Sequence, residues 1–105
     1  MKVVEYVVPL GSDGRRRVRH VRVKGRVVEF MVQYELKVGG EWYPVVRYDT
    51  AHGFAHQDIL HRQGPAEKRD LPRGDYNLTL SYAEDDLRRH WKAYRERFLR
   101  EVRQT

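Results

Sequence analysis

The sequence predicts an α+β domain in which an antiparallel β-meander of about four to five strands packs against one long C-terminal amphipathic helix. Residues 27–38 alternate apolar and polar side chains, the period of a half-buried strand. Residues 80–102 repeat apolar side chains every three or four positions, the period of a helix. Because such a helix needs an apolar surface to cover, and residues 27–38 offer the only large one, two layers follow.

The size and composition favour one folded domain over residues 1–105, since a chain of this length can wrap one apolar core but not two. No apolar run approaches the roughly 20 residues of a membrane-spanning helix, and the first residues are too soon polar for a secretory signal. We therefore expect a cytoplasmic protein with no membrane partner. The absence of cysteine excludes disulfides and thiolate zinc sites.

The first two strands are predicted from β-branched residues and turn residues. Residues 2–9 form a strand that stops at Pro9, and residues 10–14 carry the glycines of a turn. Residues 15–26 form the second strand, because Val21 and Val23 alternate with basic residues, and Gly25 turns the chain. Val18 falls off that alternation, which indicates a bulge.

Residues 27–49 predict a β-hairpin. In residues 27–38 one face is apolar and consists of Val28, Phe30, Val32, Tyr34, Leu36 and Val38. Gly39 and Gly40 can take the positive φ of a tight turn, and residues 41–49 return as the partner strand. Pro44 within that strand indicates an edge or a bulge.

The last half of the chain predicts one further strand and the helix. Residues 54–61 alternate as a strand does, and residues 62–75 hold two prolines and many charges, so we expect an exposed connection of limited order. The helix begins either at Asp75 or at the capping box Ser81–Glu84, and the earlier start is favoured. Its predicted apolar stripe is Leu80, Ala83, Leu87, Trp91, Tyr94, Phe98 and Val102.

Residues 48–61 concentrate three of the five histidines and two aspartates in fourteen positions. Metal-free cleavage of RNA needs a base, an acid and a cation or donor that holds charge on phosphate. His52 and His56 can serve as the acid and the base, and Arg47 with Tyr48 can hold the charge. Asp49 or Asp58 can orient an imidazole. The predicted catalytic set, which requires no cofactor, is Arg47, Tyr48, His52, His56 and Asp58.

Two other interpretations of the same segment stay open. His52, His56 and Asp58 or His61 offer nitrogen and oxygen ligands. On a strand, positions 52, 56 and 58 share a face, so His52, His56 and Asp58 could bind a divalent metal. Alternatively, Tyr48-Asp49-Thr50 is a turn in which Asp49 accepts a local N–H, and the histidines bond main-chain carbonyls. His20 and His90 lie outside the cluster and are expected to be packing or surface residues.

The net charge of +6, carried mostly by arginine, favours RNA as a partner. The basic stretch at 15–26 could be a track for phosphates, with Tyr6, Tyr34, Trp42 and Tyr43 available for base stacking. Equally, it could be a solvated strand that its charge protects from aggregation. The predicted nucleic-acid-binding residues are Arg15, Arg16, Arg17, Arg19 and Arg22.

The stretch VVRYDTAHGFAHQDILH, with the closing amphipathic helix, resembles an uncharacterised family of small prokaryotic proteins that share an RYD-x-AHG-x-x-H-x-D-x-LH motif. More loosely, it is similar to TumE-type toxins of toxin–antitoxin modules, and Tyr48, Asp49, His52 and His56 match that pattern, whereas Thr50 replaces its usual Asn. The resemblance implies a toxin that acts on RNA and is held by an antitoxin. A non-catalytic binding module for nucleic acid or protein is the alternative, and the chain could form a homodimer.

Overall fold

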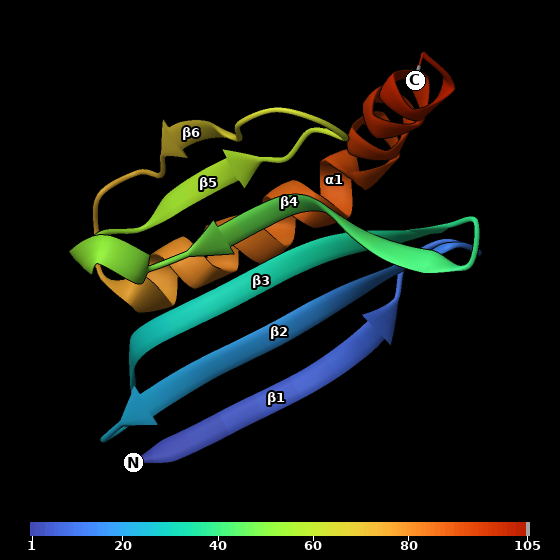
Figure 1. Ribbon diagram of the computed structural model, residues 1–105. Helices are drawn as coiled ribbons and strands as arrows, with labels where there is room; N and C mark the ends of the chain where they lie inside the picture. The colour runs from blue at the N-terminus through green and yellow to red at the C-terminus, as the bar shows by residue number, and fades with distance from the viewer. Residues whose placement is uncertain (105) are drawn as a thin grey trace.

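The computed structural model describes residues 1–104 and contains one sheet and one long helix. The elements are β1 (Lys2–Pro9), β2 (Gly14–Val23), β3 (Arg26–Val38), β4 (Glu41–Asp49), β5 (His56–Ile59), β6 (Glu67–Asp70) and α1 (Tyr76–Arg103). All neighbouring strands are antiparallel and lie in chain order (Figure 1). The predicted α+β meander and closing helix are confirmed, with six strands where four to five were expected.

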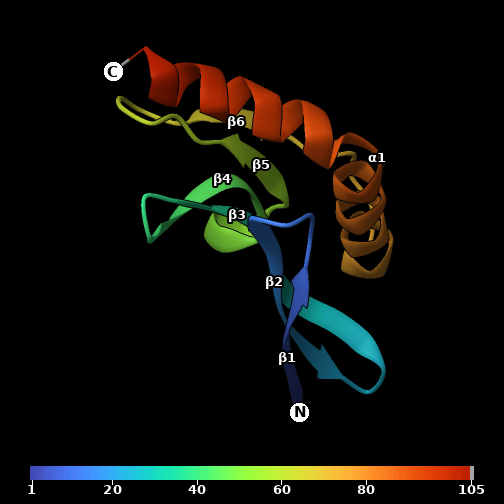
Figure 2. The ribbon, with the colours of Figure 1, turned by 90° about the vertical axis from the view of Figure 1, so that its right-hand side faces the viewer.

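The helix covers only one side of the sheet. It packs against β3 and β4, and Figure 2 shows it on one side with β1 at the far border of the sheet. We call the covered side the helix face and the other side the open face. The helix begins at the earlier of its two predicted starts, because the Asp75 carboxylate caps it by accepting the Leu78 N–H at 2.9 Å.

Strand β3 supplies the centre of the core. At its start, the alternation of buried and exposed side chains differs from the prediction. Phe30, Val32 and Leu36 are buried on the helix face as expected. Val28 was expected beside them and is 46% exposed, whereas Val27 is buried. The reason is a bulge, since the register passes from Val21↔Glu29 to Arg22↔Val27 and so skips position 28. Placing Val28 in the core was therefore wrong.

The neighbouring strand β2 lacks the bulge predicted at Val18. Val18 lies in a regular ladder opposite Val32 and is almost fully buried on the helix face. The misleading feature was Val21, which is buried although it has the opposite parity. The irregularity lies in the partner strand, at position 28.

A second bulge at Val45 determines which side chains reach the open face. Tyr34 pairs with Val46, but Glu35 pairs with Pro44, so Val45 is the extra residue. This confirms the irregularity predicted from Pro44. Beyond the bulge, Val46 and Tyr48 point to the helix face, which leaves the open face to Arg47 and Asp49, two residues of the predicted site.

Residues 62–75 hold more structure than the predicted exposed connection. Glu67–Asp70 form β6, which pairs with β5 and whose four residues are all charged and exposed. Leu71 follows the strand and is buried in the core.

The apolar content of α1 falls below what a membrane-crossing helix requires, and α1 is the one long helix of residues 1–104.

Candidate metal centre

Asp49, His56 and Asp58 meet on the open face because of the pairing between β4 and β5. Asp49 lies directly opposite His56 in the ladder. Asp58 follows His56 by two residues on the same strand, and side chains two apart on a strand share a face. The three side chains therefore gather on one patch of two adjacent strands, on the side of the sheet that faces the viewer in Figure 1.

The distances within this patch fit one ion. The His56 Nε2 atom lies 3.0 Å from Asp49 Oδ1 and 3.7 Å from Asp58 Oδ2. One donor atom from each residue lies within 4.8 Å of the other two. Two ligands on one ion at about 2.0–2.2 Å can be up to about 4.4 Å apart. The separations of 3.0 and 3.7 Å fall below this limit, and no separation within the cluster exceeds 4.8 Å.

The imidazole of His56 is held in the orientation that a metal ligand needs. Its Nδ1 atom donates to the main-chain oxygen of Phe54 at 3.3 Å. In a neutral ring with its proton on Nδ1, the lone pair of Nε2 would be directed at the two carboxylates. Histidine ligands usually donate their second ring N–H to a carbonyl or carboxylate in this way. Only 4% of His56 is exposed, so the ring has little freedom to turn.

Asp58 supplies a buried acceptor without a hydrogen-bond donor. The residue is 6% exposed, and its Oδ1 atom has no hydrogen-bond partner among the described residues. The nearest cation is the Lys68 ammonium at 3.6 Å, on a side chain that is 64% exposed. A buried carboxylate is costly unless it is paired or bound to a metal. Three potential metal-ligand atoms therefore lie close together on a largely buried patch, and the Lys68 ammonium is the cation that contacts Asp58.

The turn that connects β4 and β5 fixes the position of Asp49. Its Oδ1 atom accepts the Ala51 N–H at 3.1 Å, which confirms the predicted local turn. A 3₁₀ turn follows at Ala51–Gly53, within which His52 has a φ of +71°. Residues other than glycine are uncommon in this left-handed region, and residues held there concentrate at functional sites.

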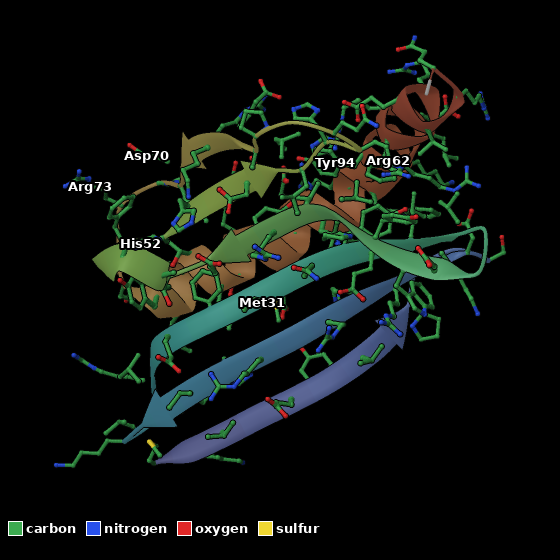
Figure 3. The ribbon with its side chains drawn as sticks, viewed as in Figure 1. Met31, His52, Arg62, Asp70, Arg73 and Tyr94 are labelled. Atoms are coloured by element: carbon green, nitrogen blue, oxygen red, sulfur yellow. The ribbon has the colours of Figure 1, made fainter. Side chains whose placement is uncertain are left out.

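His52 lies beside the cluster but not in it. Its ring centroid is 6.2 Å from that of His56, with an angle of 29° between the planes. His52 is exposed, and Figure 3 places it at the same end of the molecule as Asp70 and Arg73. Phe54 is 51% exposed, and its ring centroid lies 5.7 Å from that of His56. The centre thus has an exposed imidazole and an exposed aromatic ring at its border.

Arg47 lies on the open face next to the cluster, opposite Asp58 in the ladder. Its Nε atom donates to Gln33 Oε1 at 2.6 Å, and the Gln33 amide donates to the buried carboxylate of Glu35. Arg47 is therefore fixed by the sheet on the side of the cluster that faces β3.

Tyr48 and His61, the two ends of the histidine-rich segment 48–61, lie on the helix face. Tyr48 is fully buried and donates to Asp86 Oδ2 at 2.6 Å, and burial with this hydrogen bond raises the pKa of its phenol. His61 contacts Glu101 through Nδ1 and Glu67 through Nε2. Since these carboxylates meet opposite nitrogens of the ring, no single ion can contact all three groups. The sheet separates both residues from His56.

The five arginines predicted to bind nucleic acid do not share one surface. Arg15, Arg17 and Arg19 lie on the open face, where their partners are acidic side chains. Arg15 meets Glu35 at 2.6 Å, and its guanidinium also lies 3.8 Å above the Trp42 ring. The other two, Arg16 and Arg22, alternate to the helix face, where Arg22 donates to His20. This strand is thus a network of ion pairs more than a continuous track of free cations.

Of the three residues of the centre, Asp49 is the one that the sequence analysis did not expect as a metal ligand. It was expected to orient an imidazole or to accept a local N–H. The expected face of positions 52, 56 and 58 assumed one continuous strand. Residues 50–55 form a turn instead, which removes His52 from that face and places Asp49 opposite His56. Only the hairpin register carries this information.

Comparison with known proteins gives one match. The family model described as "Domain of unknown function (DUF7718)" matches residues 1–104. This description names neither an activity nor TumE-type toxins, and it is consistent with the expected uncharacterised family. No curated protein and no solved structure matches the chain.

Proposed function

Because the chain belongs to the DUF7718 family, whose description names no activity, we propose its function from the geometry: it binds a divalent metal ion through Asp49, His56 and Asp58. The observation that carries this proposal is the convergence of one ligand atom from each of the three residues to within 4.8 Å, with Asp58 buried and its Oδ1 atom without a hydrogen-bond partner among residues 1–104. A cation at their common point would satisfy all three. No other group of three such side chains within 4.8 Å occurs in residues 1–104.

The donor set indicates the class of metal. One imidazole nitrogen and two carboxylate oxygens suit a first-row divalent ion such as Mn²⁺, Fe²⁺ or Zn²⁺. Ca²⁺ and Mg²⁺ prefer shells made of oxygen alone. Three protein ligands leave coordination positions for water or a substrate, as catalytic sites require. The proposed centre is therefore open to chemistry.

Titration of EDTA-treated protein with Mn²⁺, followed by calorimetry, tests the proposal. The wild type should bind one ion. His56→Gln and Asp58→Asn should each weaken binding at least tenfold, because even the loss of a residue that only supports a metal ligand can weaken binding by about that factor. Asp70→Asn is the matched control, because Asp70 lies opposite His56 on β6 but outside the ligand cluster. His61→Gln is a second control on the helix face. Loss of binding in the controls with retention in His56→Gln would refute the site.

RNA as a substrate of this centre is a second candidate, favoured by the surroundings of His56. Exposed His52 and Phe54 flank the metal ligands, Arg47 lies on the opposite side, and the chain carries a net charge of +6. An aromatic ring can stack a base, and a metal ion can polarise a phosphate and activate water. The antitoxin partner implied by the TumE-type resemblance belongs to this candidate.

RNA cleavage assays with and without metal distinguish the two forms of this second candidate. Cleavage that requires Mn²⁺ and stops in EDTA would support a metal-dependent ribonuclease. Cleavage that continues in EDTA and stops in His52→Ala would support acid–base catalysis by His52 and His56 instead. The burial of His56 and the contact of both its nitrogens with protein groups favour the metal-dependent form.

A further inference from the structure

A hollow of about 520 Å³ lies at one end of the sheet, where the turn after β4, the loop after β6 and the first turns of α1 meet. Figure 1 shows these three segments side by side at the left-hand border of the molecule. The volume falls within the range of about 300–1,000 Å³ that is typical of pockets for small molecules. The side chains that line the hollow include Phe54, Asp70, Leu71, Pro72, Arg73 and Tyr76.

The hollow offers apolar and aromatic surface to a flat ring. Phe54 is 51% exposed at its border, and Leu71 connects its wall to the core. The Tyr76 hydroxyl donates to the main-chain oxygen of Gly53 at 3.2 Å, which holds the start of α1 against the turn. An exposed aromatic side chain is a surface on which a nucleobase can stack. Contacts between segments that are distant in the sequence therefore hold this wall in place.

Two charged side chains of the hollow, Asp70 and Arg73, are without a partner. Neither forms an ion pair or a side-chain hydrogen bond with any of residues 1–104. Arg15, Arg17 and Arg19 differ in this respect, because acidic side chains already pair with them. A free guanidinium suits a phosphate group, and a free carboxylate accepts N–H groups. Figure 3 shows Asp70 and Arg73 at the same end of the molecule.

We propose that this hollow binds a nucleotide, with the base against Phe54 and Asp70 and the phosphate at Arg73. A nucleotide combines a flat ring, N–H donors on the edge of that ring and a phosphate. The hollow offers a counterpart to each of them, namely an aromatic surface, a carboxylate and a guanidinium. Guanine fits best among the common bases, because it presents two adjacent N–H donors that one carboxylate can accept together.

The nucleotide site lies beside the proposed metal centre but does not depend on it. The main-chain oxygen of Phe54 accepts from His56 Nδ1, and Asp70 lies opposite His56 in the β5–β6 ladder. A nucleotide in the hollow would therefore lie next to a bound ion. The three proposed metal ligands, however, do not line the hollow. Nucleotide binding can thus be measured without metal, and the failure of one proposal leaves the other untouched.

Titration of isotope-labelled protein with GMP in EDTA, followed by NMR, tests the proposal. The amide signals of residues 53–55 and 70–76 should move and saturate, which gives a Kd. Phe54→Ala should weaken binding at least about fivefold, the lower limit for loss of an aromatic side chain that stacks a base. Arg73→Gln should weaken it about tenfold, because a charged hydrogen bond is lost. Tyr82→Ala and Arg69→Gln are the matched controls, since both side chains are exposed and neither lines the hollow.

The role of Asp70 has a separate test in the choice of base. IMP lacks the exocyclic amino group of GMP and should bind the wild type about tenfold more weakly. Asp70→Asn should remove this preference, because an amide accepts fewer N–H groups than a carboxylate. An unchanged preference in Asp70→Asn would overturn the placement of the base.

Free nucleotide and RNA are two sources of the same chemistry, and a short single-stranded RNA that ends in GMP distinguishes them. Tighter binding of this RNA than of GMP, with movement of the same amide signals, would identify a nucleotide unit of RNA as the ligand. Weaker binding would identify the free nucleotide. Signals that do not move at millimolar GMP, or equal affinities of wild type, Phe54→Ala and Arg73→Gln, would overturn the inference.

Discussion

Asp49 and His56 face each other across the β4–β5 ladder, with 3.0 Å between Oδ1 and Nε2. The turn between the strands fixes Asp49 through the Ala51 N–H, and the Phe54 carbonyl fixes the His56 ring. Asp58 adds a buried carboxylate to the same point. Strand pairing thus brings the three side chains together, and this geometry underlies the proposed metal site.

A divalent ion should stabilise the folded protein. An ion that binds only the native chain adds about 2.7 kcal/mol to the free energy of unfolding when its free concentration is 100 times the Kd. Thermal unfolding followed by circular dichroism should therefore show a midpoint that rises with Mn²⁺ concentration in the wild type. The midpoint of His56→Gln should not respond, and an equal rise in that variant would place the ion elsewhere.

Asp58→Asn should separate binding from stability. Without metal, the substitution removes a buried charge whose Oδ1 atom lacks a hydrogen bond. The free energy of unfolding should therefore stay within about 1 kcal/mol of wild type or increase, because replacing a residue kept for function often stabilises a protein. Urea unfolding in EDTA measures this. A loss of several kcal/mol in EDTA would show instead that Asp58 supports the fold through Lys68 and His56.

Tyr48→Phe should reduce stability and leave metal binding unchanged. The Tyr48 hydroxyl donates to Asp86, which also accepts from Tyr94, so removing one donor leaves a half-buried carboxylate less satisfied. The expected loss is about 1–3 kcal/mol in the free energy of unfolding. Urea unfolding and Mn²⁺ calorimetry on the same sample check both halves. A weakened metal site in this variant would argue for the catalytic role expected from the sequence.

His61 should give the protein a pH-dependent stability. Its hydrogen bond to Glu101, assisted by Glu67, raises its pKa in the folded state above the ordinary value of 6.5. A raised folded pKa means that the stabilisation is complete below pH 6.5 and is lost as the pH rises through the folded pKa. The urea midpoint of the wild type should therefore fall across that range. His61→Gln should lack this part of the fall, and a slope identical to wild type would exclude the ion pairs as its source.

Local periodicity was sufficient to predict the order of the elements and the long helix. The apolar stripe of α1 and the alternation of β3 are properties of neighbouring residues, and the Asp75 cap is a local contact. Val28 was misplaced because a bulge depends on how two strands pair, which no single strand records. The strand β6 was missed because its four charged residues are held by pairing with β5 and not by burial.

The candidate site was predicted in part for the same reason. His56 and Asp58 share a strand, so their common face follows from alternation. His52 and Tyr48 were grouped with them by proximity in the sequence, but the turn at Ala51–Gly53 and the bulge at Val45 direct them elsewhere. Asp49 joins His56 through the register between two strands. Non-local pairing therefore decides the membership of the centre.

Anomalous diffraction from crystals grown with Mn²⁺ tests the central claim most directly. The account predicts one strong peak on the open face, within bonding distance of Asp49, His56 and Asp58. A peak at the helix-face carboxylates around His61, or no peak at a Mn²⁺ concentration that saturates the calorimetric titration, would contradict it.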